Sequence, residues 1–204
     1  VVLIGGAPME MPWLDSVRAV LYAGLGGEQV GAAVYDLLFG KENPSGKLAE
    51  TWPLSLQDVP CAKYYPMGPR AVTHNEGIYV GYRYYDKAKK EVLFPFGYGL
   101  SYTKYTYSAL ECDLFPQEGG VMRVQFEVCN AGQREGSEIA QVYIGKRGSA
   151  VHRPVRTLAG FQRVHLKPGE RKRVCIEIPW SEFAVWETAS HSFAVENGAY
   201  EICV

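Results

Sequence analysis

The chain has 204 residues, of which 47% are hydrophobic and 21% charged, and its formal net charge is −1. This composition is typical of a globular protein of one or two domains. Because the basic residues form no stripe and no apolar run is long enough to cross a bilayer, we expect neither nucleic acid nor a membrane as a partner.

The first part of the chain has an α/β pattern. Val1–Gly5 and Arg18–Ala23 are apolar runs typical of buried strands, and Glu28–Phe39 carries apolar residues at helical spacing. A further short strand is predicted at Lys47–Trp52. This order predicts a mainly parallel sheet covered by helices. Because a buried strand opens the chain without a polar lead-in, we expect the chain to be part of a longer protein.

The middle of the chain is rich in turns and aromatic residues. Ser55–Pro69 is predicted to be a loop, and Ile78–Tyr85 fits either an edge strand or a short helix. Lys87–Glu91 is predicted to be a solvated turn. Phe94–Tyr102 contains Pro95, Gly97 and Gly99, which forbid a continuous helix or strand. Its rings are too apolar for a free linker, so we expect an ordered connecting arm.

From Thr106 onward, short alternating segments rich in Val, Ile, Tyr and Phe are separated by turn residues, which predicts a small antiparallel β-sandwich. Asn197-Gly198 predicts a two-residue hairpin. The predicted strands are Tyr107–Leu114, Val121–Asn130, Ser137–Lys146, Arg156–His165, Lys172–Pro179, Phe183–Val185, Ser192–Val195 and Ala199–Val204.

The five cysteines show no CxxC motif or Cys/His metal spacing, and we interpret them as buried free thiols. Free thiols favour a reducing compartment such as the cytoplasm, although a secretion signal cannot be assessed in a chain that looks truncated. The cysteines are Cys61, Cys112, Cys129, Cys175 and Cys203.

An ordered series of motifs resembles the C-terminal part of glycoside hydrolase family 3 enzymes, the β-glucosidases and β-xylosidases. The series is PMEMPW from Pro8, LFGKENPSGKL from Leu38, EGIYVGYRYYD from Glu76 and FPFGYGLSY from Phe94. Further along, LAGF from Leu158 and LKPGE from Leu166 resemble the fibronectin type III-like domain that closes many family members.

The resemblance implies a parent enzyme with a TIM-like barrel, an α/β sandwich domain and a β-sandwich, which hydrolyses β-glycosides with retention. Retention requires two carboxyl groups about 5 Å apart. In family members the nucleophilic Asp lies in the barrel, and the acid/base Glu lies upstream of the strand that matches Val1–Gly5. We therefore expect no catalytic residue in this chain and no activity from the chain alone.

His74, Asn75 and Glu76 form the most tempting polar group, and we expect them at the edge of the substrate cleft. The competing interpretation is a buried Glu76–Arg83 ion pair that holds the loop, since structural ion pairs are commoner than catalytic ones. Tyr64, Tyr65 and His74 lie on a long loop, where aromatic rings could stack on a sugar or pack against another domain. No metal site and no cofactor are expected.

The predicted fold is α/β plus all-β: part of an α/β sandwich (1–93), a connecting arm (94–107) and a fibronectin type III-like or immunoglobulin-like antiparallel β-sandwich (108–204). The predicted function is the non-barrel part of a β-glucosidase or β-xylosidase. Its expected partners are the rest of the same enzyme and a β-linked oligosaccharide or glycoside. The alternative is a non-catalytic carbohydrate-binding or structural interaction module, although Trp180 and Trp186 fit core positions and leave no evident array of exposed rings.

Overall fold

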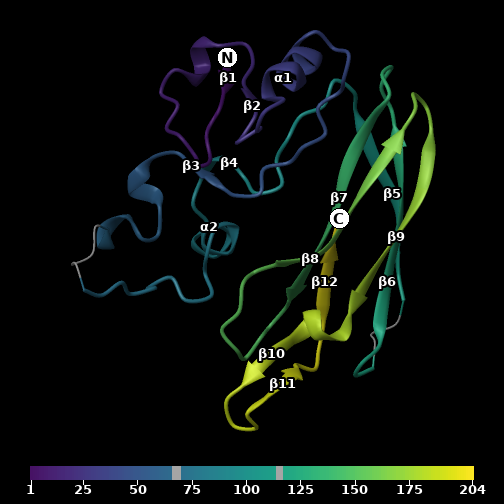
Figure 1. Cartoon of the computed structure of the whole chain (residues 1–204). Coiled ribbons are helices and arrows are strands. Elements are labelled where there is room, and N and C mark those ends of the chain that lie inside the picture. The colour runs from purple at the N-terminus through teal and green to yellow at the C-terminus, as the bar shows by residue number, and fades with distance from the viewer. Residues whose placement is uncertain (66–69, 114–116) are drawn as a thin grey trace. The chain divides into compact units, whose positions relative to one another are not determined.

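The computed structural model describes residues 1–65, 70–113 and 117–204, and the chain divides into two compact units, Val1–Gly99 and Leu100–Val204 (Figure 1). The first unit mixes short helices and strands, and the second consists mainly of antiparallel strands. In the described ranges no helix has the length and apolarity needed to cross a membrane. The predicted Ser55–Pro69 loop and Tyr107–Leu114 strand both run into residues outside those ranges.

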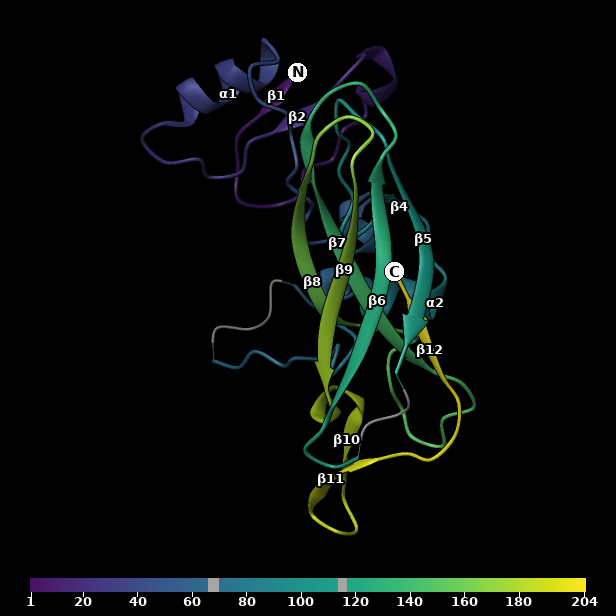
Figure 2. The same cartoon turned by 90° about the vertical axis from the view of Figure 1, so that its right-hand side faces the viewer.

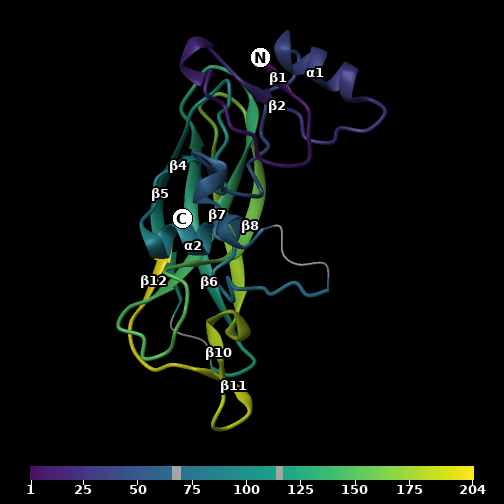
Figure 3. The same ribbon diagram turned by 90° about the vertical axis from the view of Figure 1, so that its left-hand side faces the viewer.

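The first unit contains two small sheets. Strands β1 (Val2–Leu3) and β2 (Leu21–Tyr22) are parallel, whereas β3 (Trp52–Pro53) and β4 (Val92–Phe94) are antiparallel. Helix α1 (Val30–Leu38) lies beside β1 and β2 in all three views (Figures 1, 2 and 3). The parallel sheet is therefore smaller than predicted. The strand predicted at Lys47–Trp52 appears only as β3, which begins at Trp52 and pairs with β4, a strand that the sequence analysis did not predict.

The remaining elements of the first unit are short. The ambiguous segment Ile78–Tyr85 leads into a helix, α2 (Tyr82–Ala88), not into an edge strand. This helix also takes in the start of the predicted turn at Lys87–Glu91. Three 3₁₀ helices complete the unit: η1 (Leu14–Ser16), η2 (Leu56–Asp58) and η3 (Ala62–Tyr64).

The Phe94–Gly99 segment is held by backbone pairing and by rings. The Leu48 N–H donates to the Tyr98 carbonyl at 2.8 Å, and the Gly97 N–H donates to the Leu48 carbonyl at 2.8 Å. The Phe94 ring stacks on the Tyr98 ring with centroids 5.1 Å apart. A Cβ at Gly99 would lie 2.4 Å from the Gly46 carbonyl oxygen, so only glycine permits this close approach.

Little of the first unit is buried. Of its described residues, only Met11, Thr51, Trp52 and Tyr85 fall in the buried class, and α1 contains none. Trp52 is the centre of the packing, with the Tyr22 ring 5.0 Å away and the Phe94 ring 6.2 Å away between centroids. Large apolar side chains remain exposed on α1 and in the residues that flank β1 and α1: Val1, Ile4, Leu25, Tyr35, Leu38 and Phe39.

The second unit is built from two three-stranded antiparallel sheets with orders β5-β6-β9 and β12-β7-β8 (Figure 2). The strands are β5 (Tyr105–Cys112), β6 (Val121–Asn130), β7 (Gly136–Lys146), β8 (Thr157–Leu166), β9 (Arg171–Pro179) and β12 (Tyr200–Cys203). After the 3₁₀ helix η4 (Trp180–Phe183), a hairpin of β10 (Ala184–Glu187) and β11 (Ser192–Val195) projects from one end of the unit (Figure 1).

Alternation along the strands produces the shared core of the second unit. Every second side chain of β6, β7 and β9 points inward, as a half-buried strand requires. The two sheets bury these side chains against each other in one cluster. The cluster comprises Met122, Val124, Phe126, Val128, Ala140, Val142, Ile144, Val164, Leu166, Val174, Ile176, Ile178 and Phe183.

Three predictions for the second unit are wrong. Asn197-Gly198 does not close a hairpin: β11 pairs with β10, whereas β12 crosses to β7. Trp186 does not belong to the core, since it is 51% exposed and faces the Phe193 ring on the hairpin. The cysteines are free but not buried, because alternation places Cys175 on the outer face of β9.

Strand β5 forms an outer strand of its sheet and carries an irregularity. Its pairing with β6 shifts register between Ser108 and Glu111, and Ala109 adopts a left-handed conformation with a φ of 52°. Beyond the shift, Glu111 forms an ion pair with Arg173 of β9 on the solvent face. The register shift means that β5 has one residue more than β6 at this point, which is a β-bulge. A bulge bends the strand and interrupts its hydrogen-bond ladder.

Asn130 is fully buried at the end of β6, and its side-chain amide is saturated with hydrogen bonds. Its Oδ1 accepts from the Thr103 hydroxyl at 2.6 Å and from the Gly132 N–H at 3.1 Å. Its Nδ2 donates to the Arg134 carbonyl at 2.7 Å and to the Leu166 carbonyl at 3.1 Å. One side chain thus joins the start of the unit, the turn after β6 and the end of β8.

We predict that Asn130→Asp destabilises the second unit by about 3 kcal/mol, because a carboxylate would face two carbonyls and leave them without a donor. Gln133→Glu makes the same chemical change at an exposed position of the same turn and should stay within about 0.5 kcal/mol of the parent. Urea unfolding followed by circular dichroism measures both. Equal midpoints for the two variants would contradict the role given to Asn130.

Candidate functional site

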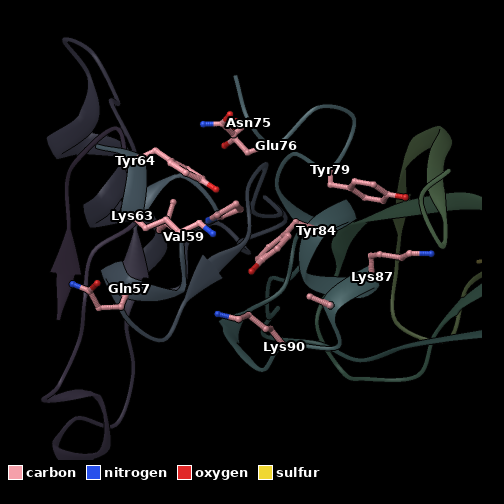
Figure 4. Close-up of a pocket in the computed structure, with 12 residues that line it drawn as sticks. Gln57, Val59, Lys63, Tyr64, Asn75, Glu76, Tyr79, Tyr84, Lys87 and Lys90 are labelled. Atoms are coloured by element: carbon pink, nitrogen blue, oxygen red, sulfur yellow. The ribbon is translucent and has the colours of Figure 1, made fainter. Parts of the chain in front are cut away.

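The first unit contains a cavity of about 570 Å³, which we call the lysine cleft. Its walls come from η2, η3, the turn at Asn75–Glu76 and helix α2 with the residues that follow it (Figure 4). The lining residues are Gln57, Val59, Pro60, Lys63, Tyr64, Asn75, Glu76, Tyr79, Tyr84, Lys87, Ala88 and Lys90.

One ion pair ties two walls of the cleft together. Lys90, just after α2, places its Nζ 2.9 Å from Oδ1 of Asp58 in η2, and the Ser55 hydroxyl donates to Oδ2 of Asp58 at 2.9 Å. The hydrogen bond from Lys90 is the main cause that lowers the pKa of Asp58, and the same hydrogen bond raises the pKa of Lys90. The ammonium of Lys90 is therefore fixed in place and charged at neutral pH.

Beside its charged groups, the cleft is lined by aromatic rings. The Nζ of Lys63 lies 4.8 Å from the centroid of the Tyr64 ring, and the Nζ of Lys90 lies 6.0 Å from that of Tyr84. Behind the wall, the Tyr84 ring meets the Tyr85 ring edge-on at 5.2 Å. Tyr85 is 6% exposed, and burial raises its pKa to about 12, so its hydroxyl stays neutral.

The structure separates the three predicted site residues. Asn75 and Glu76 line the cleft, whereas His74 is exposed and does not contribute to its lining. Glu76 does not pair with Arg83, whose guanidinium lies 6.0 Å from the Tyr82 ring centroid. The competing interpretation of a buried Glu76–Arg83 ion pair is therefore wrong. Of the two loop tyrosines, Tyr64 lines the cleft and Tyr65 is 81% exposed outside it.

The chemistry available in the cleft is recognition by hydrogen bonds and ring contacts. Glu76 is the sole carboxylate among the described lining residues, and neighbouring Asp58 is occupied by Lys90 and Ser55. A retaining glycosidase needs two carboxyl groups about 5 Å apart across the scissile bond. In the described ranges, no group of His, Cys, Asp and Glu side chains is arranged to hold a metal ion.

Sequence reasoning missed Gln57, Lys63, Tyr84 and Lys90 as parts of one site. Lys90 was assigned to a solvated turn, although it faces Asp58, 32 residues earlier. The available signal was the spacing of Tyr84 and Lys87, because a helix that continues past Tyr85, as α2 does, presents both on one face.

We predict that the Asp58–Lys90 pair stabilises the first unit in a pH-dependent way. Because the folded-state pKa of Asp58 is lowered, its contribution is present above the unfolded value of about 3.9 and is lost as the pH falls through the folded value. Asp58→Asn should therefore lower the melting temperature at pH 7, and its difference from the parent should shrink in acid.

The control for this measurement is Asp15→Asn, which removes an exposed carboxylate. Its difference from the parent should stay small at every pH. A difference for Asp58→Asn that remains constant from pH 7 down through the folded-state pKa of Asp58 would contradict the assigned ion pair.

Two family models match the chain. Residues 1–102 match the glycosyl hydrolase family 3 C-terminal domain, and residues 138–204 match a fibronectin type III-like domain. Among curated proteins, the thermostable beta-glucosidase B of Acetivibrio thermocellus is 44% identical over 205 residues, covering 100% of this chain and 27% of the relative. The probable beta-glucosidase I of Emericella nidulans is 40% identical and is covered to 25%.

Solved structures show the same likeness. A beta-glucosidase from Kluyveromyces marxianus in complex with glucose superposes with a TM-score of 0.92 at 38% identity, over 98% of this chain and 24% of the other. DesR, a beta-glucosidase from Streptomyces venezuelae in complex with D-glucose, gives a TM-score of 0.91 at 33% identity and is covered to 26%. The chain thus spans about a quarter of the length of its relatives. With half of its residues matched by the family model and its full length by these enzymes, the chain belongs to glycosyl hydrolase family 3.

Proposed function

We propose that this chain is the non-barrel part of a retaining β-glycosidase that hydrolyses β-glucosides. The observation that carries this proposal is the identity of 44% with a beta-glucosidase along the whole chain, across both units. Relatives that superpose on the chain are beta-glucosidases with glucose bound. In this proposal the chain completes and supports an active site that lies mainly in a TIM-like barrel outside it, and no cofactor takes part.

Both catalytic carboxylates are assigned to protein outside this chain. The nucleophilic Asp belongs to the barrel and the acid/base Glu to the preceding part of the α/β sandwich domain. The lining of the lysine cleft supports this assignment, since Glu76 has no second free carboxylate opposite it among the described residues. Asn75 and Glu76, with His74 beside them, are placed at the edge of the substrate cleft.

The partners proposed for the chain are the rest of the same enzyme and a β-linked glycoside. The exposed apolar side chains that flank β1 and line α1 support the first of these. Leu38, the last residue of α1, is 54% exposed, Phe39 directly after it is 70% exposed, and α1 buries none of its residues. Covering apolar surface stabilises by about 25 cal/mol per Å², so further protein packed here would be strongly favoured.

We also propose that the chain divides into three parts: part of an α/β sandwich (1–93), a connecting arm (94–107) and a fibronectin type III-like or immunoglobulin-like unit (108–204). The boundary between the two compact units, at Gly99 and Leu100, falls within the arm.

We predict that the purified chain does not hydrolyse an aryl β-glucoside. The reason is that a single free carboxylate cannot act both as nucleophile and as acid/base. Release of the aryl group measures the activity, with a full-length family 3 beta-glucosidase as the positive control. Turnover by the chain that Glu76→Gln abolishes would overturn the assignment and make Glu76 a catalytic residue.

A second prediction concerns the apolar surface of α1. The chain should self-associate through this surface as its concentration rises, and Phe39→Lys should increase the monomer fraction in sedimentation equilibrium. Phe161→Lys is the matched control, because Phe161 is 66% exposed on β8 of the other unit and should leave self-association unchanged. A parent chain that stays monomeric at all concentrations would count against a missing protein partner at this surface.

A further inference from the structure

We propose that the lysine cleft binds a small organic carboxylate, with its charged group between the ammonium groups of Lys63 and Lys90 and its apolar body against the rings of Tyr64 and Tyr84. Such a ligand is neither a glycoside nor a product of its hydrolysis, so the inference stands apart from the proposed β-glucosidase function. It also gives a role to the lysines of the cleft, which glycoside hydrolysis does not use.

The cleft carries an excess of positive charge. The ammonium groups of Lys63, Lys87 and Lys90 line it, and Glu76 supplies the single carboxylate among the described lining residues. Next to the cleft, Asp58 neutralises Lys90 across a contact of 2.9 Å. When both carboxylates are counted, one ammonium group remains without a compensating charge. A recess with an excess of one sign of charge concentrates ligands of the opposite sign, so an anion is favoured over a neutral or cationic ligand.

Lys63 and Lys90 are the lysines placed to meet the anion. Figure 4 shows them beside the space between the Tyr64 and Tyr84 rings, whereas Lys87 points away from it. Among the described residues, no carboxylate forms an ion pair with Lys63, whose Nζ lies 4.8 Å from the centroid of the Tyr64 ring. An ammonium group has three N–H donors, so the contact with Asp58 leaves Lys90 able to donate again. One lysine from η3 and one from beyond α2 thus offer donors to the same carboxylate.

The rest of the cleft suits the apolar body of such a ligand. Tyr64 is 40% exposed, and the partly buried Tyr84 ring is held edge-on against Tyr85 with centroids 5.2 Å apart. Val59 and Pro60 add aliphatic surface. The volume of about 570 Å³ lies within the usual range of about 300–1,000 Å³ for small-ligand sites. A bare ion would leave most of this volume to water, whereas a carboxylate attached to a ring fills more of it.

Glu76 restricts both the charge and the direction of the ligand. Its carboxylate repels an anion, and Figure 4 shows it beside Asn75, apart from Lys90. The charged group of the ligand therefore lies toward the two lysines and its body toward Glu76. A single negative charge balances the excess of the cleft, whereas a phosphate monoester carries about −1.5 to −2 at neutral pH. A carboxylate is therefore the better match.

The test is a titration of the 204-residue chain with benzoate and with benzamide, which have similar shapes and differ in charge, followed by NMR chemical shifts. Benzoate should bind at least about tenfold more tightly than benzamide, which corresponds to about 1.4 kcal/mol. Lys63→Met should raise the Kd of benzoate about tenfold and leave that of benzamide unchanged. Lys89→Met is the matched control, because Lys89 is an exposed lysine of the same unit that does not line the cleft.

Glu76→Gln removes the opposing carboxylate and should lower the Kd of benzoate, an effect that loss of folding would not produce. Raising the salt concentration should weaken the binding of benzoate but not that of benzamide. Equal affinities for the two probes, equal effects of Lys63→Met and Lys89→Met, weaker binding of benzoate to Glu76→Gln, or no shift changes at any soluble benzoate concentration would each overturn the proposal. Tighter binding of phenyl phosphate than of benzoate would overturn the choice of a carboxylate.

Discussion

The buried amide of Asn130 is the interaction on which the second unit depends. An amide removed from water must pair both its donor and acceptor groups, and here all four hydrogen bonds are made within the protein. Two of its partners are backbone carbonyls, which any residue at those positions supplies. The sequence requirement falls on Thr103, which gives the hydroxyl, and on Gly132, where a Cβ would lie 2.2 Å from that hydroxyl oxygen.

Close backbone contacts also hold the first unit together, since few of its side chains are buried. Gly99 lies against the Gly46 carbonyl, and the Lys47 ammonium donates to the Gly99 carbonyl at 2.8 Å. Two motifs that lie far apart in the sequence, Gly46–Leu48 and Phe94–Gly99, therefore form one structural element. Trp52 fills the small interior beside them, which explains how a unit with few buried residues keeps a defined shape.

The predictability of the fold from sequence follows the length of the elements. In the second unit, strands such as β6 and β9 run for 10 and 9 residues, long enough for a period of two to be recognised. In the first unit, β1 and β2 have two residues each, and no periodicity exists over such a length. The hairpin predicted at Asn197-Gly198 failed for another reason. Turn residues report only on local structure, whereas β12 pairs with β7, which lies more than 50 residues earlier in the chain.

The candidate site was predictable only in part, for a comparable reason. Loop position and polarity selected Asn75 and Glu76, which line the lysine cleft, whereas their place at the edge of the substrate cleft stays a prediction. The cleft they border depends on tertiary contacts, such as that between Lys90 and Asp58, which sequence spacing does not reveal. His74 has the same local context as its neighbours, but its side chain belongs to no wall of the cleft. Which of three adjacent loop residues line a cleft depends on the tertiary fold, which composition does not determine.

The bulge in β5 also has a consequence for solubility at high concentration. An outer strand offers unpaired N–H and C=O groups to any other strand, and β5 has Tyr107 41% exposed and Leu110 48% exposed. The left-handed Ala109 breaks the regular spacing of those groups in the middle of the strand. A second chain could match the edge on one side of the bulge but not across it. Replacing the bulge by a regular strand would remove this barrier to edge-to-edge aggregation.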